Sequence, residues 1–314
     1  MGQKLDTTLA LLNGLCGDYL SRTGNGLATE MACHRDGRPL PLAREAFARA
    51  YPDASARVAV LVHGVMCSET IWTLPDGSDY GSLLERDLGF TPLYLRYNSG
   101  RAIADSGAAL SALLESLLAV YPVPIEEIVP IGYSMGGLVV RSACHAASGG
   151  GQRWLARVQR AIYVGTPHLG APAERAGRFV TKVLATIDDP YTRLIAEIGD
   201  LRSDGVKDLG HADLRHEDRA LAASLRDPRH PVPLLSGIAH HLVAGSMAVD
   251  PRLSLLFGDA VVPVSSATFA VHGAAADALL PPERVKVLPG VSHLGLAHHL
   301  DVYAQLRRWC EEAP

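Results

Sequence analysis

The stretch Gly132-Tyr133-Ser134-Met135-Gly136 follows the apolar run at residues 128–131, and a helix-like segment at residues 137–144 comes after it. A strand, the pattern G-x-S-x-G and a helix in this order are the sequence signature of a nucleophile elbow. Side chains at positions 132 and 136 would collide with the neighbouring strand or helix. An ordinary glycine-rich turn is the alternative, since the chain has 30 glycines. The flanking strand and helix favour the elbow.

Apolar runs alternate with helical patterns on both sides of this stretch. Runs typical of strands buried on both faces lie at residues 58–62, 91–97, 158–164, 239–244 and 284–288. Helical spacing of apolar residues marks residues 5–20, 103–120 and 296–310, residues 68–89 supply a helix and a loop, and residues 26–42 have the pattern of an irregular hairpin. The alternation predicts an α/β fold with a mostly parallel sheet and helices on both faces.

Residues 171–233 break this alternation, because they carry helical patterns without a strand between them. Two amphipathic segments, at 179–187 and 191–201, predict a helical cap inserted after the fourth strand. Extra core helices are the alternative. We therefore expect an N-terminal helix and hairpin extension at 1–56, a core at 57–170 and 234–314, and a cap or lid at 171–233.

Composition narrows the classes of partner. The chain has 314 residues, 48% of them hydrophobic, and a net charge of -4. No cluster of lysine and arginine lies among aromatic residues, so we do not expect a nucleic-acid partner. No unbroken apolar window reaches the ~18–20 residues of a membrane span, so we expect no integral membrane segment. The oligomeric state stays open.

The expected compartment is the cytoplasm. The N-terminus has one basic residue, an early acid and an interrupted apolar stretch, which makes a poor secretion signal. The five cysteines are odd in number and contain no C-x-x-C pair, which favours reduced thiols.

A serine hydroxyl becomes a nucleophile only when a base takes its proton and an acid orients that base. In elbow-type enzymes the order along the chain is serine, acid, histidine. We predict Ser134 as nucleophile and His293 as base, because His293 lies between the last strand and the last helix. His298 is the fallback, and His299 in the same helix is expected to be a packing or surface residue.

The acid is less tightly specified by the sequence. Asp259 precedes a short apolar run and lies upstream of the histidine, so we prefer it. Asp250 competes because it is closer to the end of the strand at 239–244, and Asp277 lies in an alanine-rich loop.

A tetrahedral intermediate also needs hydrogen-bond donors for its oxyanion. The backbone N–H of Met135, directly after the nucleophile, is the first candidate. The second is Val65, in the loop that follows the strand ending in His63-Gly64. His168 follows the fourth strand and is expected to line the pocket.

Five motifs together resemble the lipase-like and inositol-deacylase-like serine esterase branch of the α/β-hydrolase superfamily. They lie at residues 61–65, 132–137, 165–170, 258–263 and 292–294, and the resemblance covers roughly residues 58–310. It implies the α/β-hydrolase fold, a serine esterase activity, Ser134, Asp259 and His293 as the catalytic triad, and Val65 and Met135 as the oxyanion hole.

Secreted lipases of this kind often carry a calcium-binding aspartate two residues after the catalytic histidine, where this chain has Gly295. We therefore expect neither a metal nor another cofactor. The sequence predicts a carboxylic-ester hydrolase acting on a small-molecule or lipid-like ester with a hydrophobic acyl part. A thioesterase or acyltransferase on the same fold, or a non-catalytic binding protein, are the alternatives.

Overall fold

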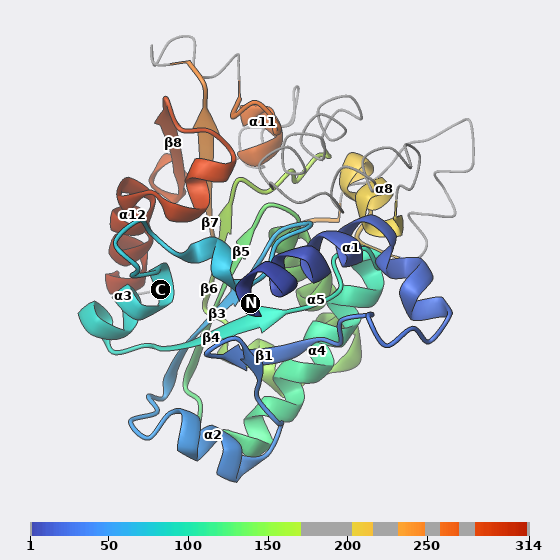
Figure 1. Ribbon diagram of the computed structural model, residues 1–314. Coiled ribbons are helices and arrows are strands. Elements are labelled where there is room, and N and C mark those ends of the chain that lie inside the picture. Colours follow the sequence, from blue (N-terminus) through green and yellow to red (C-terminus); the bar gives the residue numbers. More distant parts are fainter. Residues whose placement is uncertain (1, 171–202, 216–231, 249–257, 270–279, 313–314) are drawn as a thin grey trace.

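The computed structural model describes residues 2–170, 203–215, 232–248, 258–269 and 280–312. Within these residues, one eight-stranded sheet forms the centre of the fold, with strand order β2-β1-β4-β3-β5-β6-β7-β8 (Figure 1). The strands are β1 (Ala32–Arg35), β2 (Arg38–Pro39), β3 (Arg57–Val62), β4 (Thr91–Arg96), β5 (Glu127–Tyr133), β6 (Arg160–Val164), β7 (Ala239–Ser246) and β8 (Val285–Pro289).

The six strands from β4 to β8 in this order are parallel, as the sequence predicts. The hairpin expected at residues 26–42 is also confirmed. Its strands β1 and β2 pair antiparallel, and β1 adds antiparallel to β4 at the edge of the same sheet. Asp36 and Gly37 form the turn between them with φ of 51° and 72°.

Alternate residues of each central strand enter two separate apolar cores. Val58, Val60 and Val62 of β3 join one core, whereas Ala59 and Leu61 join the other. This is the pattern of a strand buried on both faces, and it explains why the runs are continuously apolar.

Helices cover both faces of the sheet (Figure 1). On one face lie α4 (Ile103–Val120) and α5 (Met135–Gly150), with α2 (Arg44–Ala50) against α4. On the other lie α3 (Tyr80–Leu88) and α12 (Leu300–Glu311). The described short helices are η1 (Glu69–Trp72), η2 (Arg153–Arg157), α11 (Val264–Ala267), η4 (Pro282–Arg284) and η5 (Leu294–His298).

Helix α4 packs closely on α5. A Cβ at Gly107 would lie 2.4 Å from the Ser142 Cβ, so glycine is needed for this approach. Among the described residues, α4 is also the one helix that is long and apolar enough to cross a membrane by length and composition. Its apolar residues face α5 and the sheet, where 44% of the segment is buried, as in the core helix of a globular domain.

Two helix boundaries differ from the sequence prediction. The last helix was expected to run continuously over residues 296–310, but η5 and α12 are separated at His299, whose side chain caps α12 by accepting from Asp301 N. The helix after the elbow, indicated by the sequence at residues 137–144, extends further: α5 runs to Gly150, and Gly151 caps it with φ of 64°. A side-chain cap sets the boundary at His299, and a left-handed glycine cap sets the end of α5.

Two further helices lie beside each other outside the alternating core. The predicted N-terminal helix is α1 (Gly2–Arg22), and α8 (Asp204–His211) comes from the segment expected to form the cap. The two amphipathic stretches at 179–187 and 191–201, on which that expectation depends, lie outside the described residues.

Candidate active site

The predicted elbow is the tight turn between β5 and α5. Ser134 has φ of 52° and ψ of -124°, a conformation that costs a non-glycine residue about 1–3 kcal/mol. Its backbone N–H donates to Val164 O of β6 at 2.8 Å, which fixes the turn to the next strand. The serine side chain therefore projects from the carboxyl edge of the sheet, at the start of α5.

Neighbouring glycines make this turn possible. A Cβ at Gly132 would lie 2.5 Å from Gly137 Cα at the start of α5. A Cβ at Gly136 would lie 2.3 Å from the Val62 carbonyl oxygen and 2.4 Å from that of His63. These are the collisions with helix and strand that the motif predicts, and they involve backbone atoms that cannot rotate aside.

The structure brings Ser134, His293 and Asp259 together in one hydrogen-bonded chain. His293 Nδ1 lies 2.7 Å from Asp259 Oδ2, and His293 Nε2 lies 2.9 Å from Ser134 Oγ. Because a carboxylate only accepts, Nδ1 carries the proton and Nε2 is left as an acceptor for the serine hydroxyl. All three residues are at most 2% exposed.

Backbone contacts fix the acid in place. Asp259 Oδ1 accepts from Val261 N at 3.0 Å and Val262 N at 2.7 Å, which leaves Oδ2 for the histidine. The backbone N–H of His293 also donates to Asp259 O at 3.1 Å. The loop carrying Asp259 returns to the end of β7 through a bond from Met247 N to Gly258 O. Asp250 and Asp277, the alternative acids, lie outside the described residues.

The two predicted oxyanion donors belong to segments next to the serine. Met135 is the first residue of α5, so its N–H has no partner within the helix. The loop carrying Val65 passes close to the serine, since a Cβ at Gly64 would lie 3.1 Å from Ser134 Cβ. The start of α5 and the loop after β3, which carry the two predicted donors, thus both lie next to the serine.

His63 is a buried structural residue of that loop. Its Nδ1–H donates to Gly64 O at 2.8 Å, and its Nε2 accepts from Tyr97 N at 3.3 Å. Burial lowers the pKa of His63 to about 4, so the ring is neutral near pH 7.

His168 is also buried, and it contacts a buried guanidinium. Arg141 Nη1 donates to its Nδ1 at 3.2 Å and to its carbonyl oxygen at 3.3 Å. Burial, reinforced by the nearby Arg141, holds the pKa of His168 well below its usual range. Burial lowers the pKa of Arg141 itself to about 10. His298 ends η5 and His299 caps α12, so neither takes the place of His293 in the hydrogen-bonded chain.

Three residues around the triad were not predicted from the sequence. Tyr133, inside the elbow motif, donates from its hydroxyl to His293 O at 3.1 Å. A Cβ at Gly165 would lie 3.2 Å from the His293 ring, and one at Gly245 would lie 3.1 Å from Asp259 Cβ. Gly165 follows β6 and Gly245 lies near the carboxyl end of β7, at the edge of the sheet where the site was expected, which is the signal that could have identified them.

The residues that the structure describes contain no group of three or more His, Cys, Asp and Glu side chains placed to hold a metal ion. No cofactor site is assigned.

Comparison with known proteins supports the fold. No family model matches the chain, and neither does any curated protein. The mature lipase BlEst2 of Bacillus licheniformis is similar over 80% of this chain and 91% of its own, with a TM-score of 0.50 and 18% identity. An α/β-hydrolase fold protein from Chitinophaga pinensis is similar over 83% of this chain and 91% of its own, with a TM-score of 0.47 and 15% identity.

The sheet order, the elbow between β5 and α5 and the similarity to the Bacillus lipase agree on one architecture. The chain has the α/β-hydrolase fold, as the five sequence motifs predicted.

Proposed function

We propose that this protein is a serine hydrolase that cleaves carboxylic esters through an acyl-enzyme on Ser134. The observation that supports this most is the buried hydrogen-bonded chain from Asp259 through His293 to the serine, with distances of 2.7 and 2.9 Å. The fold similarity to a lipase agrees with this class of reaction.

In the proposed reaction His293 Nε2 takes the proton of Ser134 Oγ while that oxygen attacks the ester carbonyl carbon. The carbonyl oxygen becomes an oxyanion, which the N–H groups of Val65 and Met135 stabilise. The intermediate collapses, the bond to the alcohol oxygen breaks, and the His293 imidazolium donates its proton to that oxygen. Asp259 keeps the imidazole in the required tautomer and stabilises the imidazolium.

Water completes the cycle by the same steps. His293 removes a proton from the water, the hydroxide oxygen attacks the acyl carbon, and the proton returns to Ser134 Oγ as the carboxylic acid leaves. The burial of the triad supports this role, since hydrogen bonds to developing charge are stronger where water is excluded.

The proposed substrate is an ester with a hydrophobic acyl part. Two features support this class: the apolar helical faces that the sequence predicts at 179–187 and 191–201, and the name of the Bacillus neighbour, a lipase. A panel of p-nitrophenyl esters of rising acyl length measures the preference. Parallel assays with acyl thioesters, and with an added alcohol as acceptor, distinguish esterase from thioesterase and acyltransferase action.

A fluorophosphonate probe tests the nucleophile directly. We expect one label per chain, on Ser134, and none in Ser134→Ala. Ser148→Ala is the matched control, because Ser148 lies in α5, the helix that Ser134 directly precedes, but at the surface, where it donates to His145 O. A wild-type protein that takes no label, or a Ser134→Ala protein that is still labelled, contradicts the proposal. Because Gly295 replaces the calcium-binding aspartate, we also expect turnover to be unchanged by EDTA.

A further inference from the structure

The N-terminal helix α1 packs directly against the loop that carries Val65. Leu11 and Leu15 of α1 are buried in the same apolar core as Val65 and Met66. This loop follows β3 and supplies the second oxyanion donor of the proposed mechanism. The helix precedes the alternating α/β core in the chain, so the contact joins an added element to the reacting centre.

Gly14 of α1 lies directly against Met66 of this loop. A Cβ at this position would lie 2.3 Å from Met66 Cγ, 2.9 Å from Met66 Cα and 3.0 Å from Met66 N. Two of these three atoms belong to the backbone, so the loop itself, and not only a side chain, rests on the helix. Met66 has φ of 59°, a left-handed conformation that is uncommon for a non-glycine residue and needs support from its surroundings.

Met66 is also supported by Ser99, in a segment that α1 contacts. The Met66 N–H donates to Ser99 Oγ at 3.0 Å. The neighbouring Asn98 side chain donates to Gly17 O of α1 at 2.8 Å. A Cβ at Gly100 would lie 2.1 Å from Asn13 O. The segment that holds the loop is therefore itself fixed to the glycine-containing face of the helix.

An ion-pair network holds the far end of the loop. Arg96, at the end of β4, donates from Nη1 to Asp6 of α1 at 2.9 Å and from Nε to Glu69 at 2.7 Å. Glu69 is the first residue of η1, which follows the loop directly. Its carboxylate side chain is 9% exposed and that of Arg96 is 13% exposed, so solvent screens this pair little.

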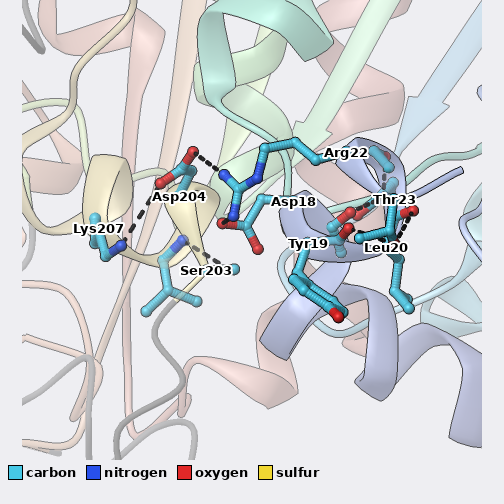
Figure 2. Close-up of polar contacts among 12 residues, drawn as sticks. Asp18, Tyr19, Leu20, Arg22, Thr23, Ser203, Asp204 and Lys207 are labelled. Atoms are coloured by element: carbon cyan, nitrogen blue, oxygen red, sulfur yellow. Dashed lines mark hydrogen bonds and ion pairs between the residues drawn. The ribbon is translucent and has the colours of Figure 1, made fainter. Parts of the chain in front are cut away.

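Helix α8 also contacts α1. Ser203 Oγ donates to Gly14 O at 2.6 Å. Figure 2 shows Arg22 reaching from α1 to Asp204 at the start of α8, an ion pair of 3.7 Å. A Cβ at Gly205 would lie 2.3 Å from Ser99 O, so α8 also contacts the segment beneath the loop. The bond from Ser203 therefore fixes Gly14, the residue that contacts Met66.

We propose that α1 is a positioning element for the oxyanion hole, with Gly14 as the positioning residue that sets the Met66 backbone and so the N–H of Val65. This inference rests on the proposed function. Loss of one oxyanion donor costs about 10²–10³-fold in kcat, and a displacement of about 1 Å can cost 10²-fold. A helix that moves the loop therefore changes turnover without contacting the substrate.

The test is Gly14→Ala, with Gly26→Ala as matched control because a Cβ at Gly26 meets nothing within 4 Å. Active sites are first counted with the fluorophosphonate probe, and kcat and KM for a p-nitrophenyl ester are then expressed per labelled site. The inhibition constant of a trifluoromethyl ketone is measured as well, because its hemiketal oxygen occupies the oxyanion site. We expect kcat to fall at least about tenfold and the ketone to bind correspondingly more weakly, with KM changed less than threefold.

Equal kcat per labelled site in Gly14→Ala and Gly26→Ala overturns the inference. So does a rise in KM with unchanged ketone affinity, which indicates looser substrate binding instead. If Gly14→Ala yields no labelled sites, Asp6→Asn takes its place: it weakens the ion-pair network from the helix side, and an unchanged kcat then overturns the inference. A wild-type protein that takes no label contradicts the proposed function itself, before any α1 variant is compared.

Discussion

Asp259→Asn is the sharpest perturbation of the candidate site, because the backbone determines how the new amide must lie. In the native protein Oδ1 accepts from Val261 N at 3.0 Å and from Val262 N at 2.7 Å. If the asparagine oxygen keeps these two bonds, its NH₂ group faces His293 Nδ1. A donor there forces the proton of the imidazole onto Nε2, where it points at Ser134 Oγ. The base then cannot accept the serine proton.

Only the opposite amide orientation would present an oxygen to His293 Nδ1 and keep the required tautomer, and that orientation is unfavourable. It would place the NH₂ group against the N–H groups of Val261 and Val262 and leave both buried donors unsatisfied. Each unsatisfied buried donor costs about 1–3 kcal/mol, so about 2–6 kcal/mol opposes the flip. We therefore expect the wrong tautomer and a fall in kcat of about 10⁴-fold, equivalent to about 5.5 kcal/mol of transition-state stabilisation.

The assay compares kcat of Asp259→Asn with that of Asp250→Asn and Asp277→Asn, the two other acids that the sequence offered. We expect these two variants to stay within about threefold of the wild type, since neither removes the bond to the histidine. Circular dichroism and urea unfolding check that Asp259→Asn is folded. A kcat within tenfold of wild type, or an equal loss in Asp250→Asn, refutes the reasoning.

Three further outcomes follow from buried contacts. Gly136→Ala places a Cβ 2.3 Å from Val62 O, so we expect about 1–3 kcal/mol of destabilisation in urea and a fall in kcat of about 10²-fold; wild-type values for both contradict this. Glu127→Gln removes the charge partner of Arg160, which is 3% exposed, and should cost about 3–5 kcal/mol in urea with kcat unchanged; a loss of kcat at full stability contradicts it. His63 has a folded pKa of about 4, below its unfolded value of about 6.5, so the unfolded state binds more protons between these values and stability falls as pH falls. Lowering the pH from 7 to 5 should cost wild type about 2 kcal/mol more than His63→Asn, and equal losses contradict this.

Sequence could predict the sheet and the meeting of Ser134, Asp259 and His293 because the relevant signals are local. A continuous apolar run such as residues 58–62 has few alternatives to a buried strand, and its two faces indeed enter two cores. The carboxyl ends of parallel strands meet at one edge, so residues after β5, β7 and β8 were expected together. The structure brings Ser134, Asp259 and His293 together at that edge.

Contacts between segments distant in the chain were not predictable in this way. Gly14 and Gly17 were two of 30 glycines, and only the placement of α1 shows what they contact. The break at His299 depends on a side-chain cap within an otherwise helical pattern. The preference for Asp259 had a sequence reason, but the two backbone donors that orient its carboxylate follow from the turn at residues 258–262, which motif spacing does not specify.

His293, the proposed base, forms two hydrogen bonds to Tyr133 and Ser134 at the end of β5, and these bonds help to fix the geometry of the site. His293 Nε2 lies 2.9 Å from Ser134 Oγ, and the carbonyl of the same histidine accepts from the hydroxyl of Tyr133, the residue before the serine. Its backbone N–H is held by Asp259 O. The backbone of His293 is therefore fixed independently of the hydrogen bonds of its ring. Less of the binding energy of a substrate is then needed to align the ring with Ser134. The loop of His293 is thus fixed at both its N–H and its carbonyl, as the loop after β3 is fixed by its contacts with α1 and Ser99.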